Sequence, residues 1–238
     1  MVYQIRYLIY KLLILLVMIS LTPVLIVRPF NLKNSLLFFN VFAFVCSKLL
    51  GVKLTIEGKE KIFQHRPAIL VGNHQHNFDI LSVAPLKTHF IVLLAKWELS
   101  LIPYFGQFYI LCGHILIKRK NHKKAMNAMD KVYQKLKEDK LSIIIFPEGH
   151  RNPTKDLLPF KKGAFHTAIR TGIPLLPFGV SQYCVYKQFE KGGKRHIHIH
   201  VGDPIYTNTL TKLDIPELMQ KTKTEIEKNI QIANKVYQ

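Results

Sequence analysis

The chain has few cysteines, and their spacing excludes two common uses of this residue. Cys46, Cys112 and Cys184 are the only three, so they cannot all pair with one another, and they lack the short spacing of a metal-binding motif. We therefore expect free thiols and a reducing compartment. The chain also lacks internal repeats and low-complexity linkers, which favours one folded domain with an appendage.

Acidic residues are scarce as well. The 238 residues include 15 aspartates and glutamates against 34 lysines and arginines, which gives a formal net charge of +19. A chain this basic is expected to have an anionic partner. Nucleic acid is not expected, because the sequence has no helix-turn-helix, zinc-finger or stacked-aromatic pattern. Since 48% of the residues are hydrophobic, anionic lipid head groups and a phosphate-bearing substrate explain the charge more simply.

The first fifty residues are rich in apolar side chains. Residues 12–27 are an uncharged apolar run of about 16 residues, lengthened around Lys11 by residues 8–10, and residues 35–50 form a second segment. The first run is shorter than the roughly 20 residues of a straight membrane span, and Pro23 is expected to kink it or end it early. We therefore predict a helical hairpin within one leaflet, or a single oblique anchor, rather than two spans. A signal peptide is not favoured, because no small-residue cleavage site follows.

From residue 52 onward, short apolar runs alternate with helical patterns. The predicted strands are 53–57, 68–71, 90–94, 115–117, 142–146, 175–180 and 195–201. The predicted helices are 78–84, 123–138, 163–171 and about 216–236. This alternation is typical of the α/β class, with a mixed, largely parallel sheet covered by helices. Functional sites in open sheets of this kind form at the carboxyl ends of the strands.

The stretch from Asn73 to Asp79 carries a candidate catalytic pair. His74 falls on the turn after a predicted strand, and Asp79 falls in the first turn of the helix that follows. A carboxylate on one imidazole nitrogen fixes the tautomer and stabilises the imidazolium that forms when the other nitrogen takes a proton. A plainer alternative is that Asn73 or Asn77 caps the helix and His74 is a polar turn residue.

Further sequence blocks follow this one in order. They are Gly113 to Arg119, Phe146 to Arg151, Phe160 to Phe165, and the proline-containing segment 172–177. This order and content resemble the glycerolipid acyltransferases, and most closely the 1-acyl-sn-glycerol-3-phosphate acyltransferases. In that family the blocks read NHxxxxD, an arginine after a glycine-led apolar strand, FPEGxR, and an apolar segment with two prolines. The resemblance covers roughly residues 50–205. We therefore divide the chain into membrane-anchoring segments, residues 1–50, and an acyltransferase domain, residues 51–238.

The resemblance implies an O-acyltransferase that moves an acyl group from acyl-CoA or acyl-carrier protein to the sn-2 hydroxyl of 1-acyl-glycerol 3-phosphate, giving phosphatidic acid for phospholipid synthesis. His74 would be the base and Asp79 its orienting partner. The residues implied in binding the phosphorylated acceptor are Arg119, Glu148, Gly149, Arg151 and, as a weaker candidate, Lys161. No metal or bound cofactor is expected, because a thioester is reactive enough for direct attack and is itself a co-substrate. The expected partners are this donor, the lysophospholipid and membrane lipid, with the catalytic domain on the cytoplasmic face of the membrane.

Three positions differ from the family pattern. His76 stands where a serine is usual, Lys118 where an aspartate is common, and His150 where threonine or serine is often found. None of them is the base or its partner, so the reaction type is kept. The acceptor is left open between lysophosphatidate, glycerol 3-phosphate and another lysolipid. A non-catalytic basic membrane-binding protein is an alternative that would be expected to lack His74 or Asp79, and a serine hydrolase is disfavoured because Gly-x-Ser-x-Gly does not occur.

Other charged and polar groups have plainer explanations than a site. His196, His198 and His200 alternate with isoleucine on one face of a predicted strand. A metal site is conceivable there, but no nearby carboxylate or cysteine completes a ligand set, so we expect a solvated face. The basic side chains between residues 118 and 124 are also expected on a solvated face. For Glu148 and Arg151, the alternative to acceptor binding is a structural ion pair at a turn.

Overall fold

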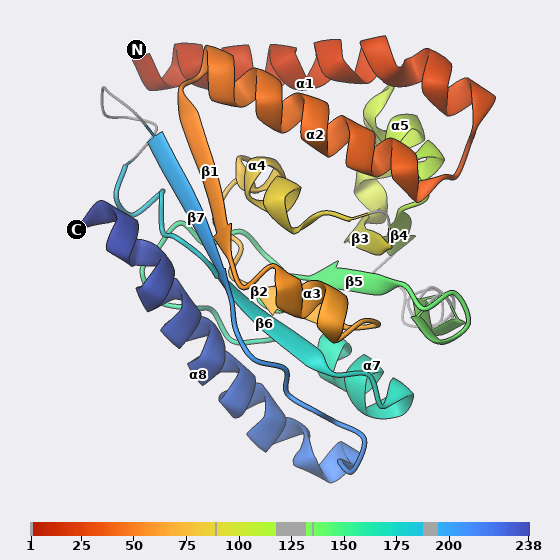
Figure 1. Ribbon diagram of the computed structural model, residues 1–238, viewed down its shortest axis with the longest axis vertical. Helices are drawn as coiled ribbons and strands as arrows, with labels where there is room; N and C mark the ends of the chain where they lie inside the picture. The colour runs from red at the N-terminus through yellow and green to blue at the C-terminus, as the bar shows by residue number, and fades with distance from the viewer. Residues whose placement is uncertain (1, 89, 118–131, 135, 188–194) are drawn as a thin grey trace.

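A seven-stranded sheet runs through the centre of the protein (Figure 1). The computed structural model describes residues 2–88, 90–117, 132–134, 136–187 and 195–238. Its strands are β1 (Val52–Glu57), β2 (Ile69–Gly72), β3 (Ile91–Lys96), β4 (Ile115–Ile117), β5 (Ser142–Ile145), β6 (Leu175–Val180) and β7 (Arg195–Val201). They lie in the order β1-β7-β6-β2-β5-β3-β4, and every neighbouring pair is parallel except β6 with β7. The predicted mixed, largely parallel sheet is confirmed.

Helices cover both faces of the sheet (Figure 1). The α-helices are α1 (Val2–Val27), α2 (Leu32–Leu49), α3 (Glu60–Gln64), α4 (Asp79–Val83), α5 (Phe105–Leu111), α7 (Gly163–Thr171) and α8 (Ile215–Asn234). Short 3₁₀ turns are η1 (Ala84–Leu86), η2 (Trp97–Leu101), η3 (Lys212–Asp214) and η4 (Lys235–Tyr237). Side chains of β2 alternate between two cores, because Leu70 joins α1, α2 and α4 on one face while Ile69 and Val71 join α7 and α8 on the other. All four residues of β2 are therefore buried.

The predicted helices agree with the structure where they can be compared. Those expected at 78–84, 163–171 and 216–236 correspond to α4, α7 and α8. The helix expected at 123–138 lies mostly outside the described residues, and its described parts, 132–134 and 136–137, are helical. Two helices were not predicted, α3 with five residues and α5 with seven, because helices this short show little periodicity.

The two N-terminal helices form a helical hairpin, as predicted, whereas its position within one leaflet stays a prediction. Gln4–Val27 and Leu32–Leu49 are each long and apolar enough to cross a membrane. Of the two outcomes predicted for Pro23, a kink or an early end of the first helix, the early end is wrong, because α1 continues to Val27. Proline removes only one backbone donor, and Leu21 and Leu25 on either side of it are buried, so packing holds the last turn in place.

The hairpin packs closely on the rest of the protein. One stripe of α1 is buried, and its members are Tyr10, Leu13, Val17, Leu21 and Leu25. Their spacing of three or four residues marks one face of a helix. The opposite face exposes Ile5, Leu8, Leu12, Leu16 and Ile19. Phe42 and Cys46 of α2 belong to the same core as Leu70 of the central strand, so segments 1–50 and 51–238 share one hydrophobic core.

Candidate active site

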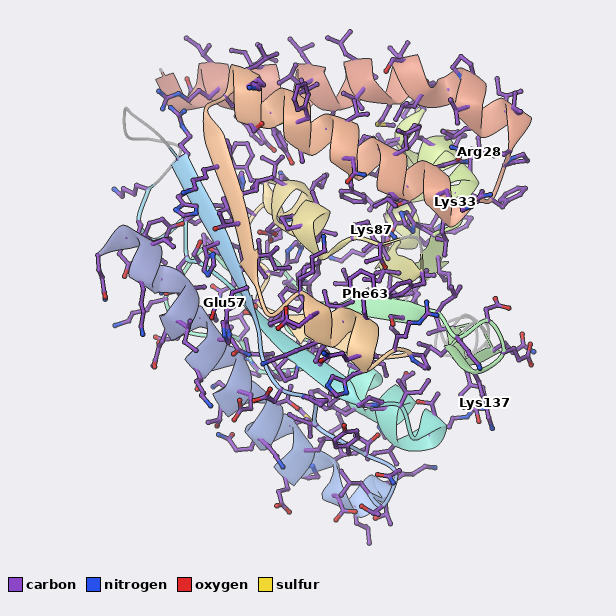
Figure 2. The ribbon with its side chains drawn as sticks, in the orientation of Figure 1. Arg28, Lys33, Glu57, Phe63, Lys87 and Lys137 are labelled. Atoms are coloured by element: carbon purple, nitrogen blue, oxygen red, sulfur yellow. The ribbon has the colours of Figure 1, made fainter. Side chains whose placement is uncertain are left out.

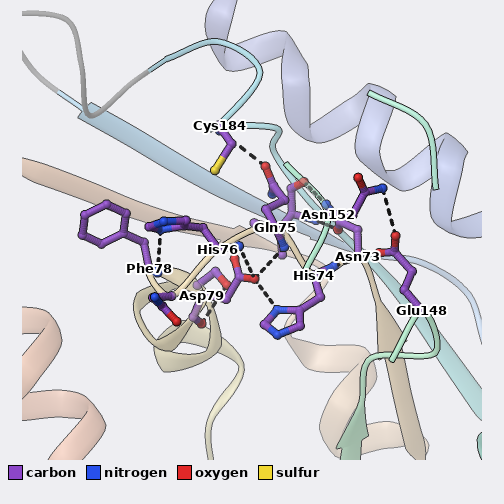
Figure 3. A network of polar contacts seen from close by, with 12 residues as sticks. Asn73, His74, Gln75, His76, Phe78, Asp79, Glu148, Asn152 and Cys184 are labelled. Carbon is purple, nitrogen blue, oxygen red and sulfur yellow. Dashed lines mark hydrogen bonds and ion pairs between the residues drawn. The ribbon is translucent and has the colours of Figure 1, made fainter. Parts of the chain in front are cut away.

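The carboxyl ends of β2 and β5 bring two of the sequence blocks together. Residues 73–79, here called the His-Asp turn, leave β2, and Glu148 follows β5, which is its parallel neighbour in the sheet. Nδ1 of His74 is hydrogen bonded to Oδ2 of Asp79 (Figure 3). The two side chains therefore meet across the turn, as the sequence predicts. The remaining ring nitrogen, Nε2, is the one left for a reacting proton.

Asp79 is buried, and several donors hold its carboxylate. Oδ2 also accepts the backbone N–H groups of Gln75 at 2.7 Å and of His76 at 3.1 Å. Oδ1 accepts the hydroxyl of Tyr183 at 2.5 Å. A buried charge is costly unless hydrogen bonds of this kind replace water. The chain therefore wraps around the carboxylate, which fixes its position beside His74.

The two asparagines that could have capped the helix make other contacts. Asn73 accepts the N–H of Val180 at 2.8 Å and donates to its carbonyl at 3.0 Å. Asn77 donates to the hydroxyl of Tyr7 at 2.5 Å. The N-cap of α4 is Phe78, without a side-chain cap. The capping alternative is therefore wrong, because Asn73 ties the His-Asp turn to β6 and Asn77 ties it to α1.

The imidazole of His74 and the backbone next to it are also held from β5 and the loop that follows. The ring of Phe146 stacks on the imidazole, with centroids 4.3 Å apart and planes 17° apart. The backbone N–H of His74 donates to Oε1 of Glu148 at 3.0 Å, and the backbone carbonyl of His74 accepts the N–H of Asn152 at 2.7 Å. Aromatic stacking and two backbone hydrogen bonds therefore limit the movement of this ring.

Glu148 lies beneath the turn and is only 2% exposed. Its second oxygen, Oε2, accepts the side-chain amide of Asn152 at 3.1 Å (Figure 3). The same oxygen accepts the N–H of Leu158 at 2.9 Å. The three donors to Glu148, which are the backbone N–H groups of His74 and Leu158 and the side-chain amide of Asn152, are all neutral. Among the described residues, no ion pair between Glu148 and Arg151 is present, so that alternative is wrong. A buried carboxylate that accepts three N–H groups stabilises the local backbone.

Gly149 and Arg151 follow directly. The φ of Gly149 is 74°, a left-handed conformation that glycine adopts without steric cost. Arg151 is exposed, and the hydrogen bond from the next residue to the His74 carbonyl places it beside the His-Asp turn. Burial lowers the pKa of His76 against the opposing effect of Asp79, and the charge of Arg151 lowers it further. A positive charge therefore lies close to the predicted base.

Lys161 and Arg119 are the other two residues predicted to bind the acceptor. Lys161 is exposed, and its backbone N–H donates to the carbonyl of Pro147 at 2.7 Å. It therefore belongs to the loop that leaves β5. Arg119, and Lys118 before it, lie outside the described residues.

Sequence reasoning missed several groups around the pair. Tyr183 is 104 residues from Asp79, and Tyr10 is 67 residues from Asn77, whose carbonyl it contacts. Such distances along the chain give no local signal. Tyr183 does follow the predicted strand 175–180, and this position at the carboxyl end of a strand was the one clue available.

The three histidines of β7 form a polar face that is partly buried rather than fully solvated. The Thr55 hydroxyl lies 2.7 Å from a ring nitrogen of both His196 and His198, and His200 lies 2.8 Å from the Asn229 side chain. Within the described ranges, no group of three or more histidine, cysteine, aspartate or glutamate side chains could hold a metal ion. The expectation that no carboxylate lies nearby is wrong, because the Glu57 carboxylate of β1 lies 3.8 Å from His198 and 3.9 Å from His200.

Comparisons with known proteins agree with the geometry. The family model described as Acyltransferase matches residues 53–181. A 1-acyl-sn-glycerol-3-phosphate acyltransferase from Haemophilus influenzae is 34% identical over 193 residues, which are 78% of this chain and 80% of that protein. The protein of the same name from Escherichia coli is 32% identical over 207 residues, or 85% and 82% of the two chains.

A solved structure has the same fold. It is the crystal structure of a 1-acyl-sn-glycerophosphate acyltransferase from Thermotoga maritima, which is 23% identical and covers 96% of both chains with a TM-score of 0.73. The segment matched by the family model contains the His-Asp turn, Glu148 and Arg151. This chain therefore belongs to the acyltransferase family.

Proposed function

We propose that this protein transfers an acyl group from acyl-CoA or acyl-carrier protein to the sn-2 hydroxyl of 1-acyl-glycerol 3-phosphate, which gives phosphatidic acid for phospholipid synthesis. The observation that carries the proposal is the hydrogen-bonded pair of His74 and Asp79, in a chain whose relatives are named as acyltransferases for this acceptor. The direct test is to incubate purified protein with mixed acyl donors and acceptors and to identify the product by mass spectrometry. Acylation of glycerol 3-phosphate alone would contradict the choice of acceptor.

In the proposed mechanism His74 acts as a general base. The acceptor hydroxyl gives its proton to Nε2 as its oxygen attacks the thioester carbonyl. Asp79, bound to Nδ1, stabilises the imidazolium that results. The tetrahedral intermediate then collapses, the C–S bond breaks, and the departing thiolate takes the proton back from His74. The step needs no covalent enzyme intermediate and no bound cofactor, since the thioester is the second substrate.

For the acceptor phosphate we propose Arg119 and Arg151, with Gly149 and Lys161 in the same loop region. The position of Arg151 beside the His-Asp turn supports this, because a phosphate bound there would bring its glycerol hydroxyl toward His74. Arginine is suited to this task since its planar guanidinium can donate two parallel hydrogen bonds to a phosphate.

Arg151→Ala is expected to raise KM for lysophosphatidate by about tenfold or more, and KM for the acyl donor much less, because the phosphate loses a charge-assisted hydrogen bond. Arg119→Ala should behave similarly. Steady-state kinetics with each substrate varied in turn will measure both constants. Arg170→Ala is a matched control, because this arginine lies on α7 and stacks on Tyr133. A rise confined to the donor KM would place the pocket on the other substrate.

We also propose that the protein lies on the membrane surface, with its catalytic domain on the cytoplasmic side where the thioester donors occur. The buried stripe of α1 extends from Tyr10 to Leu25, so most of the helix is tied to the domain while its opposite face stays apolar and exposed. Arg28 and Lys33 flank the turn between α1 and α2 (Figure 2). An apolar face bordered by cations is typical of a helix in the plane of an anionic membrane.

Replacing Leu12, Leu16 and Ile19 together by asparagine should weaken this attachment, because it removes apolar area from the exposed face. Wild-type protein should stay with anionic liposomes at about 0.5 M salt, whereas the variant should be released, because screening shortens electrostatic attraction to a few ångströms. Sedimentation across a salt series will measure this. The control is Leu213→Asn, which changes a leucine that is 89% exposed in η3, far from α1 (Figure 1). Equal release of wild type and variant would show that α1 is not the anchor.

A further inference from the structure

Two buried tyrosine hydroxyls reach the His-Asp turn from distant parts of the chain. Tyr183 follows β6, and Tyr10 lies in α1; each is 1% exposed. The Tyr183 hydroxyl donates to Oδ1 of Asp79 at 2.5 Å, and the Tyr10 hydroxyl donates to the carbonyl of Asn77 at 2.6 Å. Each hydroxyl binds a group whose position decides where the imidazole of His74 lies.

Tyr183 determines how the Asp79 carboxylate is turned. Three donors converge on Oδ2, namely His74 and the N–H groups of Gln75 and His76, whereas Tyr183 is bound to Oδ1. A rotation of the carboxylate would break the hydrogen bonds to both oxygens at once. Burial, together with the nearby Asp79 charge, raises the pKa of Tyr183 well above its usual value. The hydroxyl therefore keeps its proton and remains a donor throughout the working pH range.

Tyr10 holds the middle of the turn. Its ring packs edge-on against Phe78 with centroids 4.4 Å apart, and against Phe42 of α2 at 5.6 Å. One turn earlier in α1, Tyr7 accepts the side-chain amide of Asn77 at 2.5 Å. Asn77, between His74 and Asp79, is thus bound by two side chains of the same N-terminal helix, by Tyr10 at its backbone carbonyl and by Tyr7 at its side-chain amide. This helix therefore contacts the His-Asp turn as well as carrying the exposed apolar face that we propose lies on the membrane.

We propose that Tyr183 and Tyr10 are positioning residues for acyl transfer, Tyr183 by orienting the Asp79 carboxylate and Tyr10 by fixing the turn that carries both members of the pair. The inference rests on the proposed role of His74 as base. It assigns to α1 a part in catalysis in addition to its part in membrane attachment.

Tyr183→Phe and Tyr10→Phe remove one hydroxyl each and keep the ring. For Tyr183→Phe we expect kcat to fall about tenfold, the usual size for a hydrogen bond to a charged group, with both KM values within about twofold of wild type. For Tyr10→Phe we expect a fall of a few-fold, because its acceptor is a neutral carbonyl. The matched control is Tyr237→Phe, which removes a hydroxyl bound to Ser181 and to the carbonyl of His196.

The pH profile separates positioning from loss of stability. Tyr183→Phe removes one hydrogen bond from the Asp79 carboxylate, which should then interact more strongly with the imidazolium form of His74. The acid limb of the kcat/KM profile should therefore move to higher pH. Tyr10→Phe should leave that limb in place. The titratable and charged groups around the pair are Tyr7 and Tyr10 from α1, His76 in the turn, Glu148 and Arg151 after β5, and Tyr183 and Cys184 after β6.

A second measurement does not depend on turnover. In protein labelled with ¹⁵N-histidine, the Nδ1 proton of His74, identified by its loss in His74→Ala, should shift in Tyr183→Phe and stay in place in Tyr237→Phe. The assignment of Tyr183 is overturned if its variant keeps wild-type kcat, pH profile and proton shift, or if it loses activity only in proportion to melting temperature. The assignment of Tyr10 is overturned by unchanged kcat or by the same proportional loss. Wild-type protein that fails to acylate lysophosphatidate would contradict the proposed function instead, so the two failures are distinguishable.

Discussion

Replacing His74 by alanine is expected to lower kcat for acyl transfer about 10²- to 10⁴-fold while KM for lysophosphatidate stays nearly unchanged. This is the usual contribution of a general base. The imidazole acts only as the hydroxyl loses its proton, so its removal affects the transition state rather than acceptor binding. The structure adds a reason to expect a fall in kcat at the upper end of this range. The ring is stacked on Phe146 and bonded to a buried carboxylate, and such a fixed group is costly to replace by water.

Single-turnover and steady-state rates of purified variants will measure the effect. Asp79→Asn should show a similar loss, because an amide in place of the carboxylate favours the wrong imidazole tautomer without changing shape. His166→Ala is the control, since this histidine is exposed on α7. Activity of His74→Ala within a few-fold of wild type would rule out His74 as the base, whatever the result for Asp79.

The sequence was sufficient for the parts of the fold that local patterns determine. The central strands β2, β5 and β6 appear as short apolar runs, because strands covered on both faces are buried along most of their length. In β7, by contrast, polar and apolar residues alternate. His74 and Asp79 could also be paired from a local pattern. They lie within one turn at the end of β2, so their meeting depends only on local chain direction.

Contacts between distant segments could not be predicted in this way. Nothing local marks Tyr183 as a partner of Asp79, or Tyr10 as a partner of Asn77. Both contacts depend on where β6 and α1 lie relative to β2 in the finished fold. An early end of α1 at Pro23, one of the two predicted outcomes, does not occur, because tertiary packing of Leu21 and Leu25 outweighs the single hydrogen bond that Pro23 removes.

Glu148 shows how a sequence motif and a structure can indicate different roles for the same residue. The family resemblance implies contact with the acceptor, whereas the described contacts of its carboxylate are with His74, Asn152 and Leu158. Both of its oxygens accept N–H groups. Glu148→Gln keeps the volume of the side chain but turns one oxygen into an NH₂ group, which faces a donor in either orientation. At least one buried N–H therefore loses its partner.

We expect Glu148→Gln to lower kcat by about 10²-fold and to reduce the free energy of unfolding by about 2–4 kcal/mol, because unsatisfied buried donors cost about 1–3 kcal/mol each. For a chain of 238 residues, this corresponds to a fall in melting temperature of roughly 5–15 °C. Asn152→Ala should reduce the free energy of unfolding by less than Glu148→Gln does, because the His74 N–H keeps its acceptor. Glu217→Gln, on the exposed first turn of α8, should change little.

The two roles of Glu148 give different patterns in these measurements. If the carboxylate supports the His-Asp turn, kcat and melting temperature fall together while KM for lysophosphatidate stays within a few-fold of wild type. If it binds the glycerol or phosphate of the acceptor, KM for lysophosphatidate rises and the melting temperature of the free protein stays near that of Glu217→Gln. We expect the first pattern, because the carboxylate is 2% exposed and its N–H partners are fixed parts of the backbone and of Asn152. The second pattern would require Glu148 to exchange these donors for the acceptor during each catalytic cycle.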